Sequence, residues 1–487
     1  MQPGRVFDLL RSTRWGADRT EAELCGQIGS SVCYGAFCGG KQVAFARAHI
    51  DSRGTYHLCD VVVEREWRGR GIGTRLILAL VEDRALCGRT GTLETENAHR
   101  LYEKAGFYRC GRARMLRRPK RDEIDKGERK RCLMTKAEQL AALLPEEADG
   151  ALVTSEANRR YLTGFPSSAG MALVARKAAV FLTDSRYIEA ARRTVRGMDC
   201  VEYRSGDTLR ELVNSWGLRT LAVEDEGMTV AERRRWEGKL DGVTLLGGVL
   251  DRLLNGMRLV KTPEELAAIR RAQALTDAGF EAILPLIREG RTEREVMLDL
   301  EFSIRRAGAE RVAFDFIVVS GENSSLPHGV PGDRVIRRGD FVTMDFGAVV
   351  DGWHSDMTRT VVVGSCSDEQ REVYDIVLRA QQAALAVLCA GITGVQGDAA
   401  AREVIEAAGY GGYFGHGTGH GVGMEIHEEP RLSPSAGNAP LSAGSVVTVE
   451  PGIYLPGKFG VRIEDMVVLT ADGCENLTHS PKTLTVV

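Results

Sequence analysis

The stretch DFVTMDFGAVVDGWHSDMTRTVVVG, residues 340–364, contains two apolar runs separated by Asp351 and Gly352. An Asp-Gly pair between strand-like runs is a strong signal for a two-residue β-hairpin turn. With these two residues as the turn, Val350 lies opposite Trp353 and the pairing continues outward from them. The stretch therefore predicts an antiparallel hairpin.

The hairpin register places two aspartates on the same face of the sheet. Asp345 lies opposite Thr358 and Asp356 lies opposite Gly347, so the aspartates are diagonal neighbours with Cα atoms about 7 to 8 Å apart. Strand interiors rarely carry aspartate. The pair indicates either a polar outer face or two carboxylates that reach one ion.

Two later stretches add carboxylates to this set. GSVVTVEPGIY, residues 444–454, predicts a strand that carries Glu450, and GVRIEDMVVL, residues 460–469, predicts a strand that carries Arg462 and Glu464. Clustered carboxylates cannot all remain ionised without cations, because each raises the pKa of its neighbours. Two divalent cations would balance four carboxylates, and this ligand type favours manganese, cobalt or iron, with zinc possible.

A histidine cluster lies between these carboxylates in the sequence. FGHGTGHGVGMEIHEEP, residues 414–430, contains His416, His420 and His427, although the whole chain has nine histidines. Any one of them alone would be interpreted as a structural histidine. Next to four carboxylates, the cluster indicates nitrogen ligands or substrate-binding groups.

From about Gly256 onward the chain resembles the pita-bread metallopeptidases, the family of methionyl aminopeptidases, aminopeptidase P and prolidase. The motifs LPHG, MDFGAVVDGWHSDMTRT, GHGTGHGVGMEIHEEP, VEPGIY and VRIED occur in family order and spacing. The resemblance implies two divalent metal ions, with Mn²⁺ favoured and Co²⁺, Fe²⁺ or Zn²⁺ as alternatives. The implied metal ligands are Asp345, Asp356, His420, Glu450 and Glu464.

The same resemblance implies roles for other residues of the site. His328 and His427 would hydrogen-bond the scissile peptide, and His416 would lie on the substrate side. Arg462 would orient the site, and Glu450 would also carry the proton from the attacking water to the leaving nitrogen. A non-catalytic peptide-binding module on the same fold is the alternative, and five intact ligand positions argue against it.

Residues 132–255 resemble the N-terminal domain of the creatinase and prolidase group. The similarity rests on ANRRYLTGFPSSAGMALV at 157–174 and FLTDSRYIEAA at 181–191. It implies a homodimer and short peptide substrates with an N-terminal Xaa-Pro sequence. Xaa-Pro dipeptidase (prolidase) activity and broader aminopeptidase activity remain open.

The N-terminal block contains a different motif. In YHLCDVVVEREWRGRGIGTRLILALVEDRAL, residues 56–86, a strand, a glycine-rich turn and a helix follow one another. This arrangement directs backbone N–H groups and the positive end of the helix dipole toward a phosphate. A dinucleotide-binding motif needs three glycines and a downstream acid, and it fits less well.

With GTLETENAHRLYEKAGFYRCG at 91–111, the block resembles the GNAT acetyltransferases. The resemblance implies acetyl-CoA as cofactor, an unknown amine as acetyl acceptor, and Tyr102 as the acid that protonates the departing thiolate. Glu64 and Asp60 are the nearby candidates for a general base. A CoA-sensing domain without transferase activity is the alternative, as is acetyl transfer as the main activity. The implied cofactor-binding residues are Val61, Val63, Arg68, Gly69, Arg70, Gly71, Ile72, Gly73 and Asn97.

The composition fits a soluble, multidomain chain. Of its 487 residues, 43% are hydrophobic and 27% are charged, and the formal net charge of -3 indicates no nucleic-acid partner. No window is long and apolar enough to cross a membrane, so we expect a cytoplasmic protein. The predicted fold class is α/β and α+β: a GNAT-like fold at 1–118, a charged linker at 119–131, a creatinase-like α/β domain at 132–255 and a pita-bread domain at 256–487.

Overall fold

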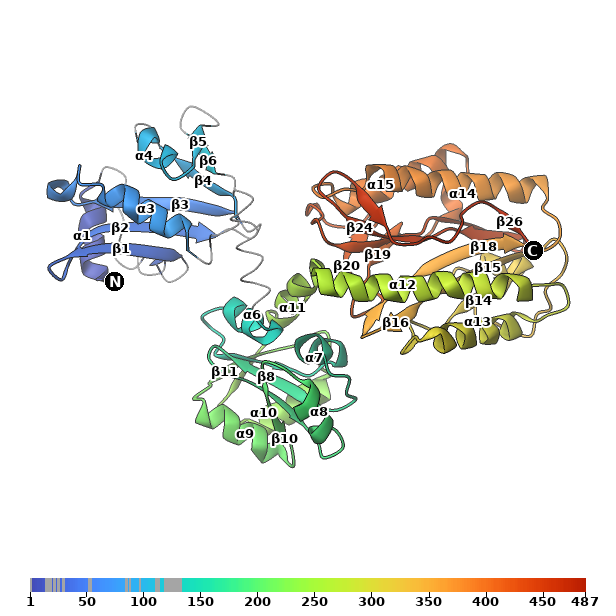
Figure 1. Cartoon of the computed structure of the whole chain (residues 1–487), viewed down its shortest axis with the longest axis horizontal. Coiled ribbons are helices and arrows are strands. Elements are labelled where there is room, and N and C mark those ends of the chain that lie inside the picture. The colour runs from blue at the N-terminus through green and yellow to red at the C-terminus, as the bar shows by residue number, and fades with distance from the viewer. Residues whose placement is uncertain are drawn as a thin grey trace. The chain divides into compact units, whose positions relative to one another are not determined.

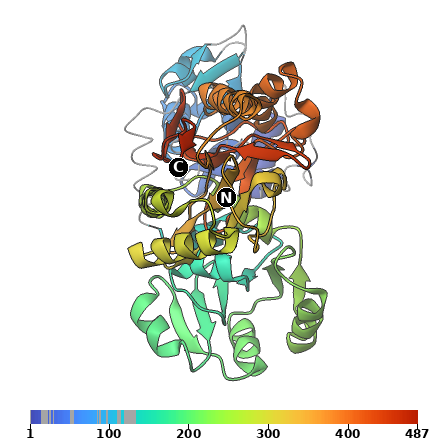
Figure 2. The same ribbon diagram turned by 90° about the vertical axis from the view of Figure 1, so that its right-hand side faces the viewer.

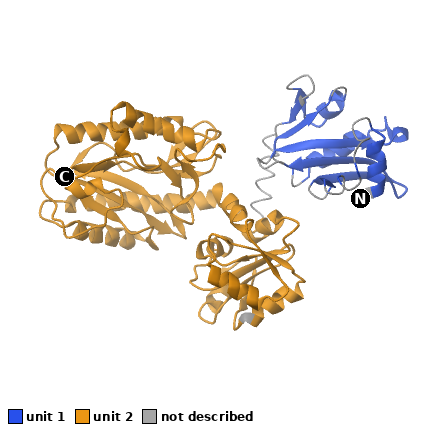
Figure 3. Cartoon of the chain, turned by 180° about the vertical axis from the view of Figure 1, so that it is seen from behind, with its two compact units in different colours: residues 1–134 blue, residues 135–487 orange. Residues whose placement is uncertain are grey.

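The computed structural model describes residues 2–13, 31–50, 55–83, 89–95, 98–109, 114–117 and 134–487, together with Thr20, Glu23, Gln27, Ile28 and Leu86. The chain forms two compact units, Met1–Met134 and Thr135–Val487 (Figure 3). The predicted linker at 119–131 lies outside the described residues.

The first unit is built on one mixed sheet with the strand order β1-β2-β3-β4-β6-β5. Its described elements are α1 (Pro3–Arg11), β1 (Val32–Cys38), β2 (Lys41–Ile50), β3 (Tyr56–Val63), η1 (Arg65–Trp67), α3 (Ile72–Val81), β4 (Gly91–Glu94), α4 (His99–Glu103), β5 (Tyr108–Arg109) and β6 (Arg114–Arg117). The predicted succession of strand, glycine turn and helix is confirmed by β3, the turn and α3.

Alternating residues of β2 and β3 bury both faces of this sheet, because successive side chains of a strand point to opposite sides. Phe45 and Val62 pack with Leu9 of α1 on one face. Ala44 and Ala46, on the other face, pack with Ile77 of α3. The sheet is therefore held between two helices.

The second unit begins with a lobe built on a six-stranded sheet of order β10-β9-β8-β7-β11-β12. This lobe comprises α6 (Lys136–Leu143), β7 (Gly150–Val153), α7 (Glu156–Thr163), β8 (Met171–Ala175), β9 (Ala179–Thr183), α8 (Ile188–Thr194), β10 (Asp199–Glu202), α9 (Gly206–Ser215), β11 (Thr220–Val223), α10 (Val230–Lys239), β12 (Thr244–Leu246) and α11 (Leu250–Leu259). The alternation of strands and helices predicts a small α/β domain, and the sheet confirms it.

The remainder of the second unit is a larger lobe in which helices cover largely antiparallel sheets, with β18 and β26 as a parallel pair. Its helices are α12 (Pro263–Ile283), α13 (Glu293–Ala307), α14 (Asp368–Val387) and α15 (Gly394–Ala407). Its strands are β13 (Arg311–Val312), β14 (Ile317–Ser320), β15 (Phe341–Phe346), β16 (Ala348–Val350), β17 (Trp353–His354), β18 (Met357–Val362), β19 (Gly419–Gly421), β20 (Glu428–Leu432), β21 (Val446–Val449), β22 (Gly452–Leu455), β23 (Phe459–Arg462), β24 (Asp465–Leu469), β25 (Cys474–Asn476) and β26 (Thr485–Val486).

The helices of the larger lobe form two outer layers with the strands between them. Helices α14 and α15 lie on one side of the strands, and α12 and α13 lie on the other, in both Figure 1 and Figure 2. Phe280 and Leu300 anchor one layer on Met344 of β15. Val377 anchors the opposite layer on Val467 of β24. The predicted α/β and α+β fold class is confirmed.

Local capping signals explain where the long helices begin. The Thr262 side chain accepts a hydrogen bond from the backbone N–H of Glu265, and the Glu265 carboxylate accepts one in return from the Thr262 backbone, with Pro263 in the first turn. This capping pattern is typical of a helix start, and it opens α12. No helix among the described residues has the length and apolar character needed to span a membrane.

A buried polar network connects the two lobes of the second unit. Arg258 of α11 donates from Nε to Glu428 Oε1 at 3.1 Å and from Nη1 to Asn158 Oδ1 at 2.8 Å. Lys261 donates to the other oxygen of Glu428 at 3.3 Å. The side chains of Arg258 and Glu428 are only 3% and 5% exposed. Helix α11 thus joins α7 of the smaller lobe to β20 of the larger one.

Replacing Arg258 with methionine is expected to lower the free energy of unfolding by about 3 kcal/mol, because it leaves a buried carboxylate with one fewer cation. Urea unfolding of the full chain measures this change. Arg270→Met is the matched control, since Arg270 pairs with Glu475 at the surface, and it should cost less than about 1 kcal/mol. Equal losses in both variants would contradict the assignment of a special role to the buried pair.

Candidate metal centre

The predicted hairpin is present, with its register unchanged. Val350 pairs with Trp353 and Asp345 pairs with Thr358. Both turn residues, Asp351 and Gly352, have positive φ angles of 52° and 86°. This backbone conformation is the one that a tight two-residue hairpin requires.

The two strands expected in this hairpin are four in the structure. The ladder breaks at Gly347 and around Ser355, so that β15 and β18 belong to one sheet and β16 and β17 to another. A Cβ atom at Gly347 would lie 1.9 Å from the carbonyl oxygen of Ser355, which explains why glycine is needed at this crossing. Asp356 therefore lies at the break, immediately before β18.

Glu450 and Glu464 also lie at strand ends, although the sequence pattern placed them within strands. Glu450 follows β21, and Glu464 lies between β23 and β24. Backbone groups at strand ends are free to turn, so side chains there can be aimed across the sheet. Three of the four carboxylates thus come from positions where strands end, and Asp345 alone lies inside one.

Three of the four carboxylates each have one oxygen atom without a hydrogen-bond partner among the described residues. Asp345 Oδ1, Asp356 Oδ1 and Glu464 Oε1 are buried and have no hydrogen-bond partner among the described residues. Burial and neighbouring carboxylates raise the pKa values of Asp356 and Glu464 well above the ordinary range. Buried, unpaired and mutually repelling carboxylate oxygens are the environment that a divalent cation would stabilise.

His420 presents a nitrogen to the same region. Its Nδ1 donates to the carbonyl oxygen of Gly421 at 3.0 Å. This bond turns Nε2 toward Asp356 Oδ2 at 3.6 Å and toward Glu450 Oε1 at 3.3 Å. Fixing the tautomer through the outer nitrogen is how proteins orient metal-binding histidines. Asp356, His420 and Glu464 each offer a ligand atom, and these atoms lie within 4.8 Å of one another.

The pKa of Glu450 is set largely by His420 in the protein without a bound cation. Burial raises the pKa of Glu450, but hydrogen bonding and the charge of His420 outweigh it and bring the pKa to about 2. His420 Nε2 and Glu450 Oε1 lie 3.3 Å apart, so both could contact the same metal ion. The donor set of oxygens and one imidazole fits hard or borderline divalent ions.

Arg462 holds two of the candidate carboxylate ligands in place. Its guanidinium donates to Asp345 Oδ2 at 2.6 Å and to Thr358 Oγ1 at 3.0 Å. Thr358 Oγ1 in turn donates to Glu464 Oε2 at 2.7 Å. Arg462 thus contacts one carboxylate directly and a second one through threonine.

Tyr454 is a further residue of the site, beyond those predicted from the sequence. Its hydroxyl accepts a hydrogen bond from Arg462 Nη1 at 2.8 Å and lies 2.9 Å from Nε2 of His416. The Nδ1 of His416 donates to the carbonyl of Gly417 at 2.8 Å. Tyr454 therefore links the metal side of the site to His416. It belongs to the quoted VEPGIY motif, which was the available signal.

The candidate ligands open into a cavity of about 930 Å³. His328, His416 and His427 line it together with all five candidate ligands and Arg462. The rings of His420 and His427 lie 4.4 Å apart, centroid to centroid. Burial and the nearby His420 lower the pKa of His427 to about 4, so its ring is neutral at pH 7. The structure thus brings every predicted residue of this site together.

The first unit presents the glycine turn as expected. Gly71, with a φ angle of 73°, directly precedes α3, and the exposed Gly69 has a φ angle of 78°. Arg68 Nε donates to the carbonyl of Val63 at 2.9 Å, and the Arg70 guanidinium stacks 4.8 Å from the Trp67 ring centroid. Gly73 and Ile72 begin the helix. The backbone N–H groups of the turn therefore lie at the N-terminal end of α3.

Strands β3 and β4 separate soon after they meet. They pair only at Tyr56 with Gly91 and at His57 with Thr92 among the described residues. Beyond this point β3 continues through Val61 to Val63 without a β4 partner. An open strand edge beside the glycine turn can bind an extended, amide-containing chain.

Other predicted residues of the first unit give a mixed result. Tyr102 lies on α4, and burial raises its pKa to about 12. Asn97 lies outside the described residues. Lys41 and Arg5 bond to Glu64 and lower its pKa, and Asp60 pairs with Arg47 at 2.8 Å. Both candidate bases are ion-paired, which weakens them as proton acceptors.

Comparison with known families gives three matches along the chain. Residues 267–471 match metallopeptidase family M24, residues 138–260 match the creatinase/prolidase N-terminal domain, and residues 29–109 match the acetyltransferase (GNAT) domain. The order is the one predicted from the sequence.

Individual relatives cover about seven-tenths of the chain. The uncharacterized peptidase YqhT of Bacillus subtilis (strain 168) is 44% identical over 341 residues, which are 70% of this chain and 96% of the relative. The solved structure of Xaa-Pro dipeptidase from Bacillus anthracis is 42% identical, with a TM-score of 0.70, over 72% of this chain and 99% of that one. X-Pro aminopeptidase from Thermotoga maritima MSB8 is 39% identical, with a TM-score of 0.68, over 72% and 100%.

Proposed function

Because the chain belongs to metallopeptidase family M24, we propose that it is a dinuclear metal-dependent aminopeptidase that removes the N-terminal residue from short Xaa-Pro peptides. Similar proteins named for X-Pro aminopeptidase and Xaa-Pro dipeptidase activity support this substrate class. Xaa-Pro dipeptidase activity, or a broader aminopeptidase activity, is the alternative.

One observation carries the proposal. Three buried carboxylate oxygens, on Asp345, Asp356 and Glu464, have no hydrogen-bond partner among the described residues. Asp356 and Glu464 offer ligand atoms within 4.8 Å of one on His420, and the cavity that these residues line also contains three more histidines. Asp345, Asp356, His420, Glu450 and Glu464 would hold two divalent ions. Bound ions would polarise the scissile carbonyl and increase the acidity of a water molecule.

The protein's own groups would handle the proton and the substrate. Glu450, the least buried of the glutamates in the site, would accept the proton of the attacking water and pass it to the leaving nitrogen. His427 and His328 would donate hydrogen bonds to the peptide, and His416, fixed by Tyr454, would lie on the substrate side. Arg462 would keep Asp345 in place.

A substrate panel tests this proposal. The full chain is stripped of metal, supplied with Mn²⁺, Co²⁺ or Zn²⁺, and assayed on Xaa-Pro dipeptides, Xaa-Pro-Yaa tripeptides and controls without proline. Metal-dependent cleavage of proline tripeptides supports the aminopeptidase, whereas cleavage of dipeptides alone favours the dipeptidase. Cleavage without metal, or none with any metal, would refute the metal centre.

For the first unit we propose acetyl-CoA-dependent N-acetyltransferase activity toward an unidentified amine. The glycine turn before α3 and the open edge of β3 support binding of a pyrophosphate and an extended pantetheine arm. The ion pairs of Glu64 and Asp60 favour the alternative, a CoA-sensing domain without transferase activity. Acetyl-CoA turnover with a panel of amines separates the two.

Replacing Gly71 with valine is expected to raise the Kd for CoA by at least about tenfold, because a branched side chain at positive φ strains the turn by about 1 to 2 kcal/mol and blocks its N–H groups. Calorimetric titration of the full chain measures it. Gly40→Val is the matched control, since Gly40 also has a positive φ angle, 80°, but lies in the β1–β2 turn. Similar loss of CoA binding in both variants would contradict the site.

We also propose a homodimer, on the basis of the resemblance to the creatinase and prolidase group, and a cytoplasmic location, on the basis of the sequence pattern. Light scattering of the purified chain at several concentrations tests the oligomeric state. A monomer at all concentrations would refute it.

A further inference from the structure

Arg359 is an arginine on β18 with almost no contact with solvent. Its side chain is 1% exposed, and it points to the face opposite that of Thr358. The guanidinium donates to the carbonyl oxygens of Thr358 at 2.9 Å, Ser480 at 2.8 Å and Pro481 at 3.1 Å. It also donates to the carbonyl oxygen of Glu464 and to a carboxylate oxygen of Asp465. All five of its N–H groups are accounted for.

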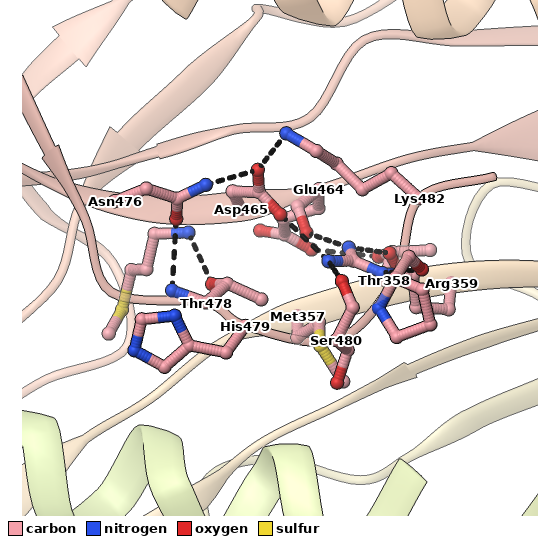
Figure 4. Close-up of polar contacts among 12 residues, drawn as sticks. Met357, Thr358, Arg359, Glu464, Asp465, Asn476, Thr478, His479, Ser480 and Lys482 are labelled. Atoms are coloured by element: carbon pink, nitrogen blue, oxygen red, sulfur yellow. Dashed lines mark hydrogen bonds and ion pairs between the residues drawn. The ribbon is translucent and has the colours of Figure 1, made fainter. Parts of the chain in front are cut away.

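Asp465 is the acidic partner of Arg359 and is completely buried. Its carboxylate accepts from Arg359 Nη2 at 2.8 Å, Gln381 Nε2 at 2.9 Å and Asn476 Nδ2 at 2.8 Å, and from the Lys482 ammonium. Figure 4 shows Asn476 and Lys482 reaching the carboxylate from different sides. Four separate segments therefore meet at one buried charge.

Glu464, a proposed metal ligand, is held between these groups. Its backbone N–H donates to the carbonyl of Thr358 at 3.1 Å, and its carbonyl accepts from Arg359. Its Oε2 accepts from Thr358 Oγ1, so Oε1 is the oxygen left without a partner among the described residues. Arg359 and Asp465 do not line the cavity, so we place them behind the proposed metal ligands.

The segment that follows β25 completes this support. Ser480 is fixed to Asp277 of α12 by its N–H at 2.9 Å and its hydroxyl at 2.6 Å. Beyond Lys482, β26 pairs in parallel with β18 through Val361 and Thr485. The carbonyls that Arg359 binds in this segment are therefore held in place themselves.

A buried ion pair is weak evidence for a gain in stability, because desolvation of both charges offsets their attraction. Arg359 instead binds two consecutive residues, because it donates to the backbone carbonyl of Glu464 and to the carboxylate of Asp465. We propose that Arg359 and Asp465 are positioning residues that hold Glu464 in the geometry needed to retain metal ions. The inference rests on the proposed metal centre.

The test is the affinity of the metal-free full chain for Mn²⁺, measured by calorimetry with a competing chelator. Asp465→Asn keeps the shape of the side chain but removes the charge that Arg359 requires. Partners of metal ligands typically contribute about 10- to 100-fold to affinity, so the Kd for Mn²⁺ should rise at least about tenfold. Arg359→Lys, with fewer and differently directed donors, should behave in the same way.

Lys136→Met is the matched control. Lys136 of α6 pairs with the 9%-exposed Glu265 of α12 at 2.6 Å, so this ion pair joins elements other than β18 and β24. This variant should lower the melting temperature and leave the Mn²⁺ affinity unchanged. An equal loss of affinity in Lys136→Met would overturn the inference, since any destabilisation would then suffice.

Two further outcomes are decisive. Asp465→Asn that folds and binds Mn²⁺ within twofold of the parent would overturn the positioning role, whereas a parent chain that binds no Mn²⁺ would overturn the metal centre itself. Should Asp465→Asn fail to fold, Lys482→Met removes one donor to the same carboxylate at a side chain that is 22% exposed. Weaker Mn²⁺ binding by that variant supports the inference, and unchanged binding overturns it.

Discussion

Replacing Glu450 with glutamine is expected to lower kcat about a thousandfold, the scale of a lost general acid-base group. Glutamine keeps the size of the side chain and an oxygen that can accept from Thr448, which lies 3.1 Å from Glu450 Oε1. It cannot accept a proton from water at neutral pH. The fold should therefore persist while proton transfer to the leaving nitrogen fails.

Steady-state kinetics on an Xaa-Pro tripeptide with saturating Mn²⁺ measures this effect. Metal content is determined on the same sample, because Glu450 is also a proposed ligand and lost metal would lower the rate for a different reason. Glu429→Gln, an exposed glutamate two residues from His427, is the control and should retain parental kcat. Near-normal turnover in Glu450→Gln would refute the proton-transfer role.

Replacing Asp356 with alanine is expected to have opposite effects on the metal-loaded and metal-free proteins. Without ions, burial and the neighbouring Glu464, Asp345 and Glu450 raise the pKa of Asp356 well above its ordinary range. Removing this carboxylate relieves the repulsion, so the metal-free protein should become more stable. The metal-loaded protein loses a ligand and should become less stable, and turnover should fall at least about a hundredfold. Functional sites commonly carry such a cost in stability.

Melting temperatures with and without saturating Mn²⁺ measure both effects, and elemental analysis gives the number of bound ions. Asp398→Ala is a useful contrast, because Asp398 is a buried aspartate that accepts hydrogen bonds from Arg402 and Thr418. Its loss should destabilise both forms. A metal-free Asp356→Ala protein with a lower melting temperature than the parent would mean that Asp356 stabilises the fold without a cation, which would contradict this prediction.

Local rules were sufficient for several parts of this protein. The Asp351-Gly352 turn sets the register that pairs Asp345 with Thr358, and the capping residues around Thr262 start α12. The glycine turn at Gly71 starts α3 in the same way. Each of these features depends on residues close together in the chain, and motif similarity extended them to the family.

Other features required contacts between distant segments. Thr358 meets Glu464 across 106 positions, and His416 meets Tyr454 across 38. The hydrophobic periodicity of a strand is nearly the same for any sheet packing, so it could not reveal that the strands break at Gly347. The four side chains that donate to Asp465 come from separate segments, so no local pattern could identify them. By itself the sequence determined the turns, the helix starts and the identity of the chemical groups. The tertiary structure alone decided which carboxylate oxygens are left without partners, because this depends on how separate sheets pack against one another.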